Sequence, residues 1–234
     1  EIVEQLLAAD AKIDIADNDG DTALFVAANN GDEAIVSVLC KKIIESGRQT
    51  LLNQPSGPNR DTTPLMCASN EGCVQALVDA GAQLELADTA GLTALMLAVL
   101  QAECDVVSRL ISAGASLHAR AWSFHGQSVL HLAVIRGNVQ YLELLISQGA
   151  DVNVQDDYGC TPLFQAVRAG RADLVSCLLS NRADPNLKDV KQQCPLLVAM
   201  RSGAHAAREV EQLLRDAGCT ELNSTCGGSV VASG

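Results

Sequence analysis

The sequence predicts an all-α solenoid, in which thin helix-turn-helix units are stacked and joined by short β-hairpin-like connections. Three observations predict this fold class. A six-residue phrase recurs six times along the 234 residues, and a glycine follows most copies at a fixed distance. Apolar residues make up 48% of the chain but aromatic residues only 3%, so Leu, Ala, Val and Ile must fill the core. Such side chains suit thin helical layers better than a β-sandwich.

The recurring phrase has Leu at its third place and Ala at its sixth place in every copy. The copies are TALFVA at 22, TPLMCA at 63, TALMLA at 93, SVLHLA at 128, TPLFQA at 161 and CPLLVA at 194. Their starting points are separated by 41, 30, 35, 33 and 33 residues. Self-similarity at such a period is the signature of a repeat protein, because each short unit buries its apolar face only by stacking on its neighbours.

Each copy of the phrase is predicted to start a short first helix. Thr or Ser offers a side-chain oxygen to an unpaired N–H of the first turn, and Pro, where present, takes the first helical position. Cys194 replaces the capping residue in the last copy and should weaken that start. A glycine nine places later can adopt the left-handed conformation that ends a helix. These glycines are Gly31, Gly72, Gly137, Gly170 and Gly203.

A second helix is predicted after each glycine, because apolar pairs such as Leu145-Ile146 recur near the end of each unit. A Gly-Ala pair or a close relative follows, as at Gly149-Ala150. A D-x-x-G turn, as at Asp156 to Gly159, then reverses the chain into the next copy. The unit is therefore a helix, a turn, a second helix and a hairpin.

These phrases, together with the G-A-D-V-N sequence at 149–153, resemble the ankyrin repeat. The resemblance extends from Glu1 to about Asn223. It implies a curved array with hairpins along one edge and the shorter first helices lining a concave groove. The physical argument agrees, because a two-helix unit cannot bury both of its apolar faces alone.

The expected array covers residues 1–222, and residues 223–234 are expected to form a flexible tail. A partial repeat at 1–16 suggests that the chain begins inside an array. The full repeats are expected at about 17–58, 59–87, 88–119, 120–155, 156–188 and 189–222. The 41-residue spacing predicts a long helix that breaks at Gly47 or before Pro55, and the 30-residue spacing predicts a second helix shortened by three residues.

Composition and charge exclude several classes of function. No apolar run reaches the roughly 18 residues that a membrane span needs, so no membrane insertion is expected. The net charge is −12, and residues 1–119 alone contribute −11, which disfavours nucleic acid. The nine cysteines are scattered without a C-x-x-C pair, which favours reduced thiols in the cytoplasm or nucleus and no metal site.

No catalytic centre or cofactor site is expected. His131 occupies the T-P-L-H position of the ankyrin pattern, where the imidazole is expected to bind neighbouring backbone. His118, His125 and His205 lie in different repeats, without a Ser, Cys or carboxylate at a recognisable catalytic spacing. The chain also has no Gly-rich phosphate loop ahead of a helix, so it is not expected to be an enzyme.

The candidate partner-binding residues lie at hairpin tips or at the ends of first helices, where stacking constrains a side chain least. Aromatic and arginine side chains there are typical anchors of protein interfaces. The candidates are Trp122, Phe124, Ile135, Arg136, Tyr158, Arg168 and Arg201. The three arginines are expected to form a basic line in the groove. The alternative is that these are ordinary exposed residues, with Trp122 packing a hairpin that is two residues longer than the others.

The expected function is that of a protein-protein interaction module within a larger intracellular scaffold, regulator or adaptor, whose partner offers apolar and acidic contact residues. Two alternatives are a targeting arm of a multidomain enzyme and a ubiquitin-ligase substrate adaptor. A third is an inhibitor of a Rel-type transcription factor, because D-G-D-T-A-L at 19–24 resembles a phrase of those inhibitors. The segment 145–153 also resembles ankyrin segments hydroxylated by an asparaginyl hydroxylase, which makes Asn153 a candidate modification site.

Overall fold

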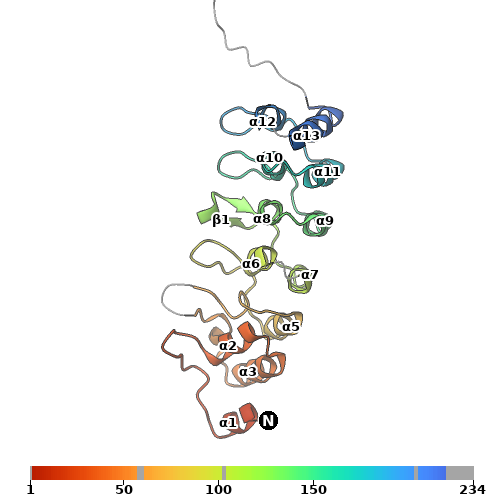
Figure 1. Ribbon diagram of the computed structural model, residues 1–234. Coiled ribbons are helices and arrows are strands. Elements are labelled where there is room, and N and C mark those ends of the chain that lie inside the picture. Colours follow the sequence, from red (N-terminus) through yellow and green to blue (C-terminus); the bar gives the residue numbers. More distant parts are fainter. Residues whose placement is uncertain (1, 57–60, 102–103, 203–204, 220–234) are drawn as a thin grey trace, which may run out of the picture.

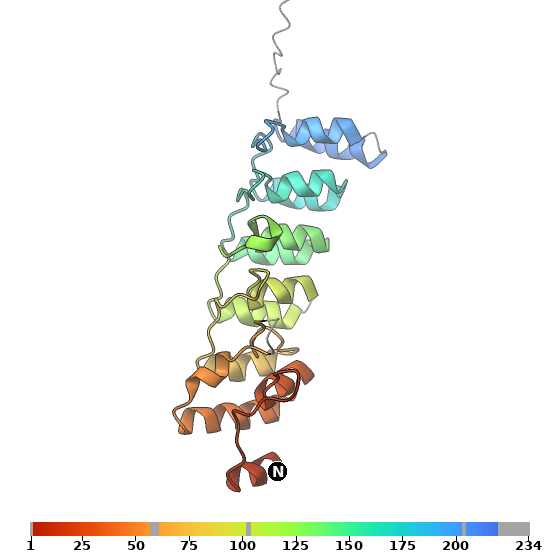
Figure 2. The ribbon, with the colours of Figure 1, turned by 90° about the vertical axis from the view of Figure 1, so that its left-hand side faces the viewer.

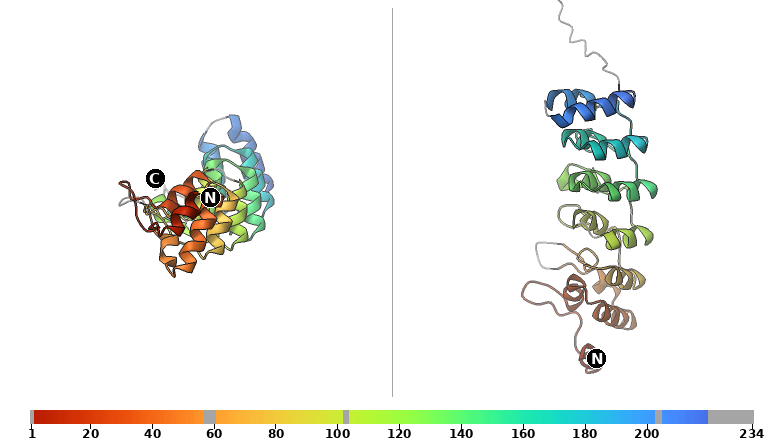
Figure 3. Two further views of the ribbon diagram at one scale, coloured as in Figure 1. Left: turned by 90° about the horizontal axis from the view of Figure 1, so that it is seen from below. Right: turned by 45° about the vertical axis from the view of Figure 1, so that its right-hand side comes forward.

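The computed structural model describes residues 2–56, 61–101, 104–202 and 205–219. These residues form an elongated stack of helical layers, which confirms the predicted all-α class (Figure 1). In a complete layer, a hairpin lies at one edge, the first helix lies in the middle, and the second helix lies at the opposite edge. We call the first helices inner and the second helices outer. Successive layers follow one another along the stack without interruption by another domain (Figure 2 and Figure 3).

The inner helices are α2 (Ala23–Asn30), α6 (Ala94–Gln101), α8 (Val129–Arg136), α10 (Pro162–Arg168) and α12 (Pro195–Ser202). The outer helices are α1 (Ile2–Ala8), α3 (Glu33–Glu45), α5 (Glu71–Asp79), α7 (Cys104–Ser112), α9 (Val139–Ser147), α11 (Ala172–Ser180) and α13 (His205–Asp216). The remaining elements are the 3-10 helices η1 (Gln49–Asn53) and η2 (Trp122–Phe124) and the strands β1 (Arg120–Ala121) and β2 (Gln127–Ser128).

The core is built from the two unvarying residues of the recurring phrase. Every phrase leucine is at most 3% exposed, and every phrase alanine is at most 4% exposed. The leucines are Leu24, Leu65, Leu95, Leu130, Leu163 and Leu196, and the alanines are Ala27, Ala68, Ala98, Ala133, Ala166 and Ala199. Full burial of one leucine contributes about 1.5–3 kcal/mol, so each repeat gains stability from this contact in addition to the buried residues of its second helix.

The predicted helix starts are confirmed for most inner helices. The Oγ1 atoms of Thr22, Thr93 and Thr161 accept hydrogen bonds from the backbone N–H three residues later, at 3.3, 3.4 and 3.2 Å. Pro162 takes the first position of α10, where its missing N–H leaves no bond unmade. These caps set where each inner helix begins.

The prediction of a first helix was wrong for the copy at 63–68. Residues 64–67 form a turn, and the described residues between α2 and α6 contain no inner helix. The prediction that the three missing residues come from the second helix was also wrong, because α5 has nine residues, as do α7, α9 and α11. The deletion therefore removes most of the first helix.

The start of α5 and its cap at Asn70 show where the three residues are missing. Glu71 begins α5 eight positions after Thr63, whereas Cys104 begins α7 eleven positions after Thr93. The Asn70 side chain caps α5 by accepting a hydrogen bond from the Cys73 N–H at 2.8 Å. Its amide N–H also donates to the Gly31 carbonyl at 2.8 Å. The shortened segment is thereby attached to the preceding layer without a helix.

The glycines predicted to end the first helices can be compared with the structure. Gly72 lies inside α5 and does not end a first helix, as had been predicted. Gly31 and Gly137 do end their helices, each with a φ of 77°. Gly203 and the predicted tail at 223–234 lie outside the described residues.

The longer first repeat has the predicted form. Helix α3 extends to Glu45, and the chain then turns at Gly47, whose φ is 68°. The following 3-10 helix η1 buries Leu52 completely. The inserted residues therefore add a buried contact at the base of their loop.

An aspartate side chain stabilises most of the hairpin turns in the same way. In four of them, an aspartate Oδ1 accepts hydrogen bonds from the N–H groups two and four residues later, at 2.8–2.9 Å. These aspartates are Asp17, Asp88, Asp156 and Asp189. The hairpin of the fourth repeat differs, because Ala121 occupies the aspartate position. There the pairing of β1 with β2 and the turn of η2 hold the loop.

We predict that Asp156→Ala lowers the free energy of unfolding by about 2–3 kcal/mol, because the buried N–H of Cys160 and the partly buried N–H of Tyr158 lose a charged acceptor. Urea denaturation followed by circular dichroism measures this change. The matched control is Asp157→Ala, since Asp157 is exposed and its ion pair with Arg120 should contribute only about 0–1 kcal/mol. Equal effects of the two substitutions would contradict the role of the carboxylate.

Candidate protein interface

The predicted partner-binding residues lie on the hairpin and inner-helix side of the last three repeats. Trp122 is 61% exposed, Ile135 is 56% exposed and Tyr158 is 50% exposed. Arg136, Arg168 and Arg201, at the last turns of α8, α10 and α12, are exposed as well. Phe124 differs from the rest, because it is half-buried and packs against the core. Phe124 therefore has a structural contact that the sequence analysis did not anticipate.

Trp122 lies on the neighbouring hairpin. Its Nε1–H donates to the Thr89 carbonyl at 3.3 Å. The indole covers Gly91 so closely that a Cβ added there would lie 2.6 Å from the ring. Gly91 also has a φ of 81°, so both its conformation and this contact require glycine. The structure thus combines both interpretations of Trp122, which packs on the hairpin and remains largely exposed.

Tyr158 of the fifth hairpin and His125 of the fourth form an aromatic pair. Their ring centroids are 4.7 Å apart and their planes are inclined by 53°. The Tyr158 hydroxyl lies 3.2 Å from the His125 Nδ1 atom. His125 has a left-handed backbone with a φ of 54°, which directs the chain back from η2. The pair fixes the orientation of an exposed ring without burying it.

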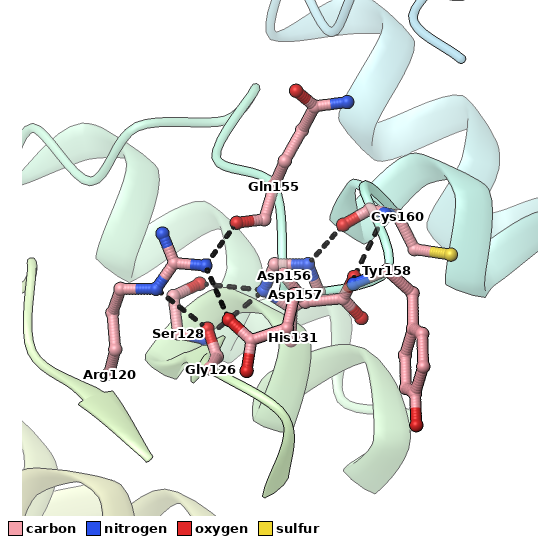
Figure 4. Close-up of polar contacts among 9 residues, drawn as sticks. All are labelled: Arg120, Gly126, Ser128, His131, Gln155, Asp156, Asp157, Tyr158 and Cys160. Atoms are coloured by element: carbon pink, nitrogen blue, oxygen red, sulfur yellow. Dashed lines mark hydrogen bonds and ion pairs between the residues drawn. The ribbon is translucent and has the colours of Figure 1, made fainter. Parts of the chain in front are cut away.

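Arg120 joins the fourth and fifth hairpins through its guanidinium group (Figure 4). Its Nε–H donates to the Gly126 carbonyl at 2.9 Å, and an Nη2–H donates to the Gln155 carbonyl. The Nη2 atom also lies 3.7 Å from a carboxylate oxygen of Asp157. One guanidinium thus bridges the fourth and fifth hairpins, a role that sequence analysis missed.

His131 has the structural role that was predicted for it. The ring is fully buried, and its Nδ1 atom accepts a hydrogen bond from the Ser128 N–H at 3.2 Å. This arrangement leaves the proton on Nε2, which lies 2.9 Å from the Cys160 carbonyl and donates to it. His131 therefore caps α8 and connects it to the following hairpin (Figure 4).

The arginines do not occupy one equivalent position. Arg168 and Arg201 each follow their capping residue by seven places, a position that Ile135 occupies in α8. Arg136 is one residue further along, where it lines a shallow depression with Asn138, Gln140 and Asp173. At the seventh position after the capping residue, α8 therefore carries an isoleucine, and α10 and α12 each carry an arginine. The basic line formed by Arg136 together with Arg168 and Arg201 stays a prediction.

Asn153 connects the fifth hairpin to the sixth. The side chain is half-buried, and its Oδ1 atom accepts a hydrogen bond from the Asp184 N–H at 2.8 Å. Its own backbone N–H donates to Asp151 Oδ1 at 2.9 Å. Asn53 makes an equivalent bond to the Gln83 N–H at 2.8 Å. The hydroxylation of Asn153 stays a prediction.

The thiols of the described residues are free, and several are buried. Burial raises the pKa of Cys40 to about 11 and that of Cys67 to about 12. Burial also raises the pKa of Cys160 to about 11, although Arg168 opposes this rise. No group of three or more possible metal ligands is present among the described residues. None of the described helices is long and apolar enough to cross a membrane.

We predict that His131 makes stability depend on pH. Burial lowers its pKa from the ordinary value of 6.5, so the unfolded chain takes up a proton more readily than the folded protein. The free energy of unfolding should therefore fall as the pH drops below about 6.5. Urea denaturation at about pH 7.5 and pH 5.5 measures this loss.

The variant His131→Gln isolates this contribution, because glutamine can also complete a capping box but does not titrate. Its loss of stability between the two pH values should be smaller than that of the wild-type protein. An equal loss in both proteins would exclude His131 as the titrating group.

Comparison with known proteins identifies the repeat family. The family model for ankyrin repeats in three copies matches residues 49–121 and 122–189, and the single ankyrin repeat model matches residues 19–44. The chain is 28% identical over 158 residues to the NF-kappa-B p105 subunit of Gallus gallus, which covers 67% of this chain and 16% of that protein. It is 35% identical over 145 residues to NF-kappa-B inhibitor alpha of Sus scrofa, which covers 59% of this chain and 45% of that protein.

A solved structure shows the same arrangement of repeats. The crystal structure of the ankyrin repeat domain of Bcl-3, described as a unique member of the IkappaB protein family, matches with a TM-score of 0.71 at 26% identity. The match covers 92% of this chain and 90% of that domain. The chain spans less than half the length of the two relatives named above. With family models matching most of its length, the chain belongs to the ankyrin repeat family, whose domains are protein-protein interaction modules.

Proposed function

We propose that this module holds a partner protein on the hairpin and inner-helix surface of its last three repeats. The observation that carries the proposal is the distribution of exposed apolar side chains. Among the described residues, the exposed large hydrophobic side chains fall into two groups, at 2–44 and at 122–200. Both exposed aromatic residues, Trp122 and Tyr158, lie in the second group, where Ile135 is also more than half exposed. Exposed aromatic residues beside arginine are typical of interface anchors.

The charge of this region supports a partner with acidic as well as apolar contact residues. Residues 120–234 carry a net charge of −1, whereas residues 1–119 carry −11. Exposed charges more than about 8 Å apart are largely screened at physiological salt. The local positive charge of Arg136, Arg168 and Arg201 should therefore outweigh the distant acidic half.

A Rel-type transcription factor is a second candidate partner. Two relatives carry NF-kappa-B in their names, and one of them is named as an inhibitor of it. The chain covers only part of each relative, so an inhibitory role would require binding through the shared repeats. The targeting-arm and ubiquitin-ligase-adaptor alternatives use the same surface and differ only in what it recruits.

The module itself is proposed to act by binding and not by catalysis. Within the described residues of this region, His131 is buried and engaged with backbone and Ser128, and the exposed His125 contacts Tyr158. The described cysteines are free thiols, as expected of a protein in the cytoplasm or nucleus.

We predict that Trp122→Ala and Arg168→Ala each weaken partner binding about tenfold or more, as expected for interface anchors. The partner is first captured from cell lysate by the wild-type chain and identified by mass spectrometry. A purified Rel-type transcription factor is tested in parallel as a candidate partner. Dissociation constants of the variants are then measured by calorimetry, with folding checked by circular dichroism.

The matched control is Arg48→Ala, because Arg48 is an exposed arginine whose ion pair with Asp14 lies in the acidic half. The affinity of the Arg48→Ala variant for the partner should equal that of the wild-type chain. Unchanged affinity of the Trp122 and Arg168 variants would exclude this surface as the partner site.

We also propose that Asn153 is hydroxylated in its native cell. The predicted observation is an intact mass greater by one oxygen atom, which peptide fragmentation places on Asn153. The peptide containing Asn53, whose side chain makes the equivalent bond, serves as an internal comparison. Native protein without the added oxygen would exclude the modification.

A further inference from the structure

Large side chains are exposed at three consecutive hairpin tips. Trp122 is 61% exposed at the fourth hairpin, Tyr158 is 50% exposed at the fifth, and Val190 is 62% exposed at the sixth. His125, which contacts Tyr158, is also exposed. We call these four residues the tip row. The hairpins that carry them follow one another along one edge of the stack (Figure 1).

Backbone hydrogen bonds fix the spacing within the tip row. The Asp157 N–H donates to the His125 carbonyl at 2.8 Å, and the Val190 N–H donates to the Tyr158 carbonyl at 2.9 Å. Trp122 is itself held against the preceding hairpin. A ligand that binds such a preformed row loses little of its binding energy to ordering the protein.

The acidic side chains of these hairpins are already engaged within the protein. Asp156 and Asp189 are buried and accept hydrogen bonds from their own turns. Asp157 is paired with Arg120. Lys191, by contrast, is exposed at the sixth tip. The row therefore presents apolar side chains, with the positive charge of Lys191 at its sixth tip, and this end of the row complements an acidic ligand.

The spacing of the layers favours an extended ligand. Packed helices lie about 8–10 Å apart, so successive tips should be separated by a similar distance. A polyproline II segment has three residues per turn and rises about 3.1 Å per residue. Every third residue of such a segment points to the same side, and these residues are about 9 Å apart. Because the spacing of every third ligand residue is close to the spacing of successive tips, one ligand side chain can contact each tip.

We propose that the tip row binds an extended acidic segment in the polyproline II conformation, with an apolar side chain at every third position. The inference rests on the proposed function, because it specifies the partner of the same surface. The three apolar side chains contact Trp122, the ring pair of His125 and Tyr158, and Val190. The carboxylate next to the last apolar side chain faces the positive charge of Lys191.

Trp122 provides a direct readout, because it is the only tryptophan in the chain. The probe is a synthetic peptide with three Leu-Pro-Glu triplets, titrated while the tryptophan fluorescence is recorded. A peptide of the same composition in scrambled order tests the period, and a Leu-Pro-Lys peptide tests the charge. We expect the first peptide to bind at least about tenfold more tightly than either control.

The variants Tyr158→Ala and Val190→Ala should each weaken binding of the Leu-Pro-Glu peptide several-fold, with folding checked by circular dichroism. The matched control is Ile15→Ala, because Ile15 is 62% exposed in the first hairpin, and its affinity should stay unchanged. Equal binding of the triplet and scrambled peptides by the wild-type protein would overturn the inference. Capture of a folded partner that depends on Trp122, without any binding of the triplet peptide, would also overturn it and leave the proposed function intact.

Discussion

Each layer of this protein is too thin to bury its own apolar faces, and this constraint governs the rest of the structure. The phrase leucines and alanines are buried only because another layer lies against each of them. Stability is therefore the sum of contacts between neighbours, and no residue distant in the stack contributes to it directly. The surfaces that face away from the stack are free to vary, and those surfaces carry the candidate interface.

Most of the fold could be predicted because its determinants are local. A threonine cap, a buried leucine three places into the phrase and a left-handed glycine each act within one unit, so they appear as a pattern in the sequence. The error at 63–68 has the same origin. The phrase is intact there, but spacing alone does not show which of two flanking helices lost three residues. The cap formed by Asn70 ahead of Glu71 was the signal that could have placed the deletion.

The candidate interface could be predicted only in part. The exposure of Trp122, Ile135 and Tyr158 follows from their positions in the unit, and the structure agrees with it. Arg120 and His125 were missed because their partners lie more than 30 residues away in the next hairpin. Contacts between neighbouring hairpins have no fixed residue pattern, since each one depends on which side chains two particular copies happen to present.

The shortened second repeat shows where such an array can change its length. The outer helices α3, α5 and α7 pack in succession past the missing inner helix, so the layers that follow keep their regular stacking. The deletion in the second repeat is thus confined to the inner-helix side, whereas the insertion in the first repeat lengthens the outer helix α3 and the loop that follows it. A solenoid with this property can lose much of a helix on its recognition side during evolution while its spine stays in register.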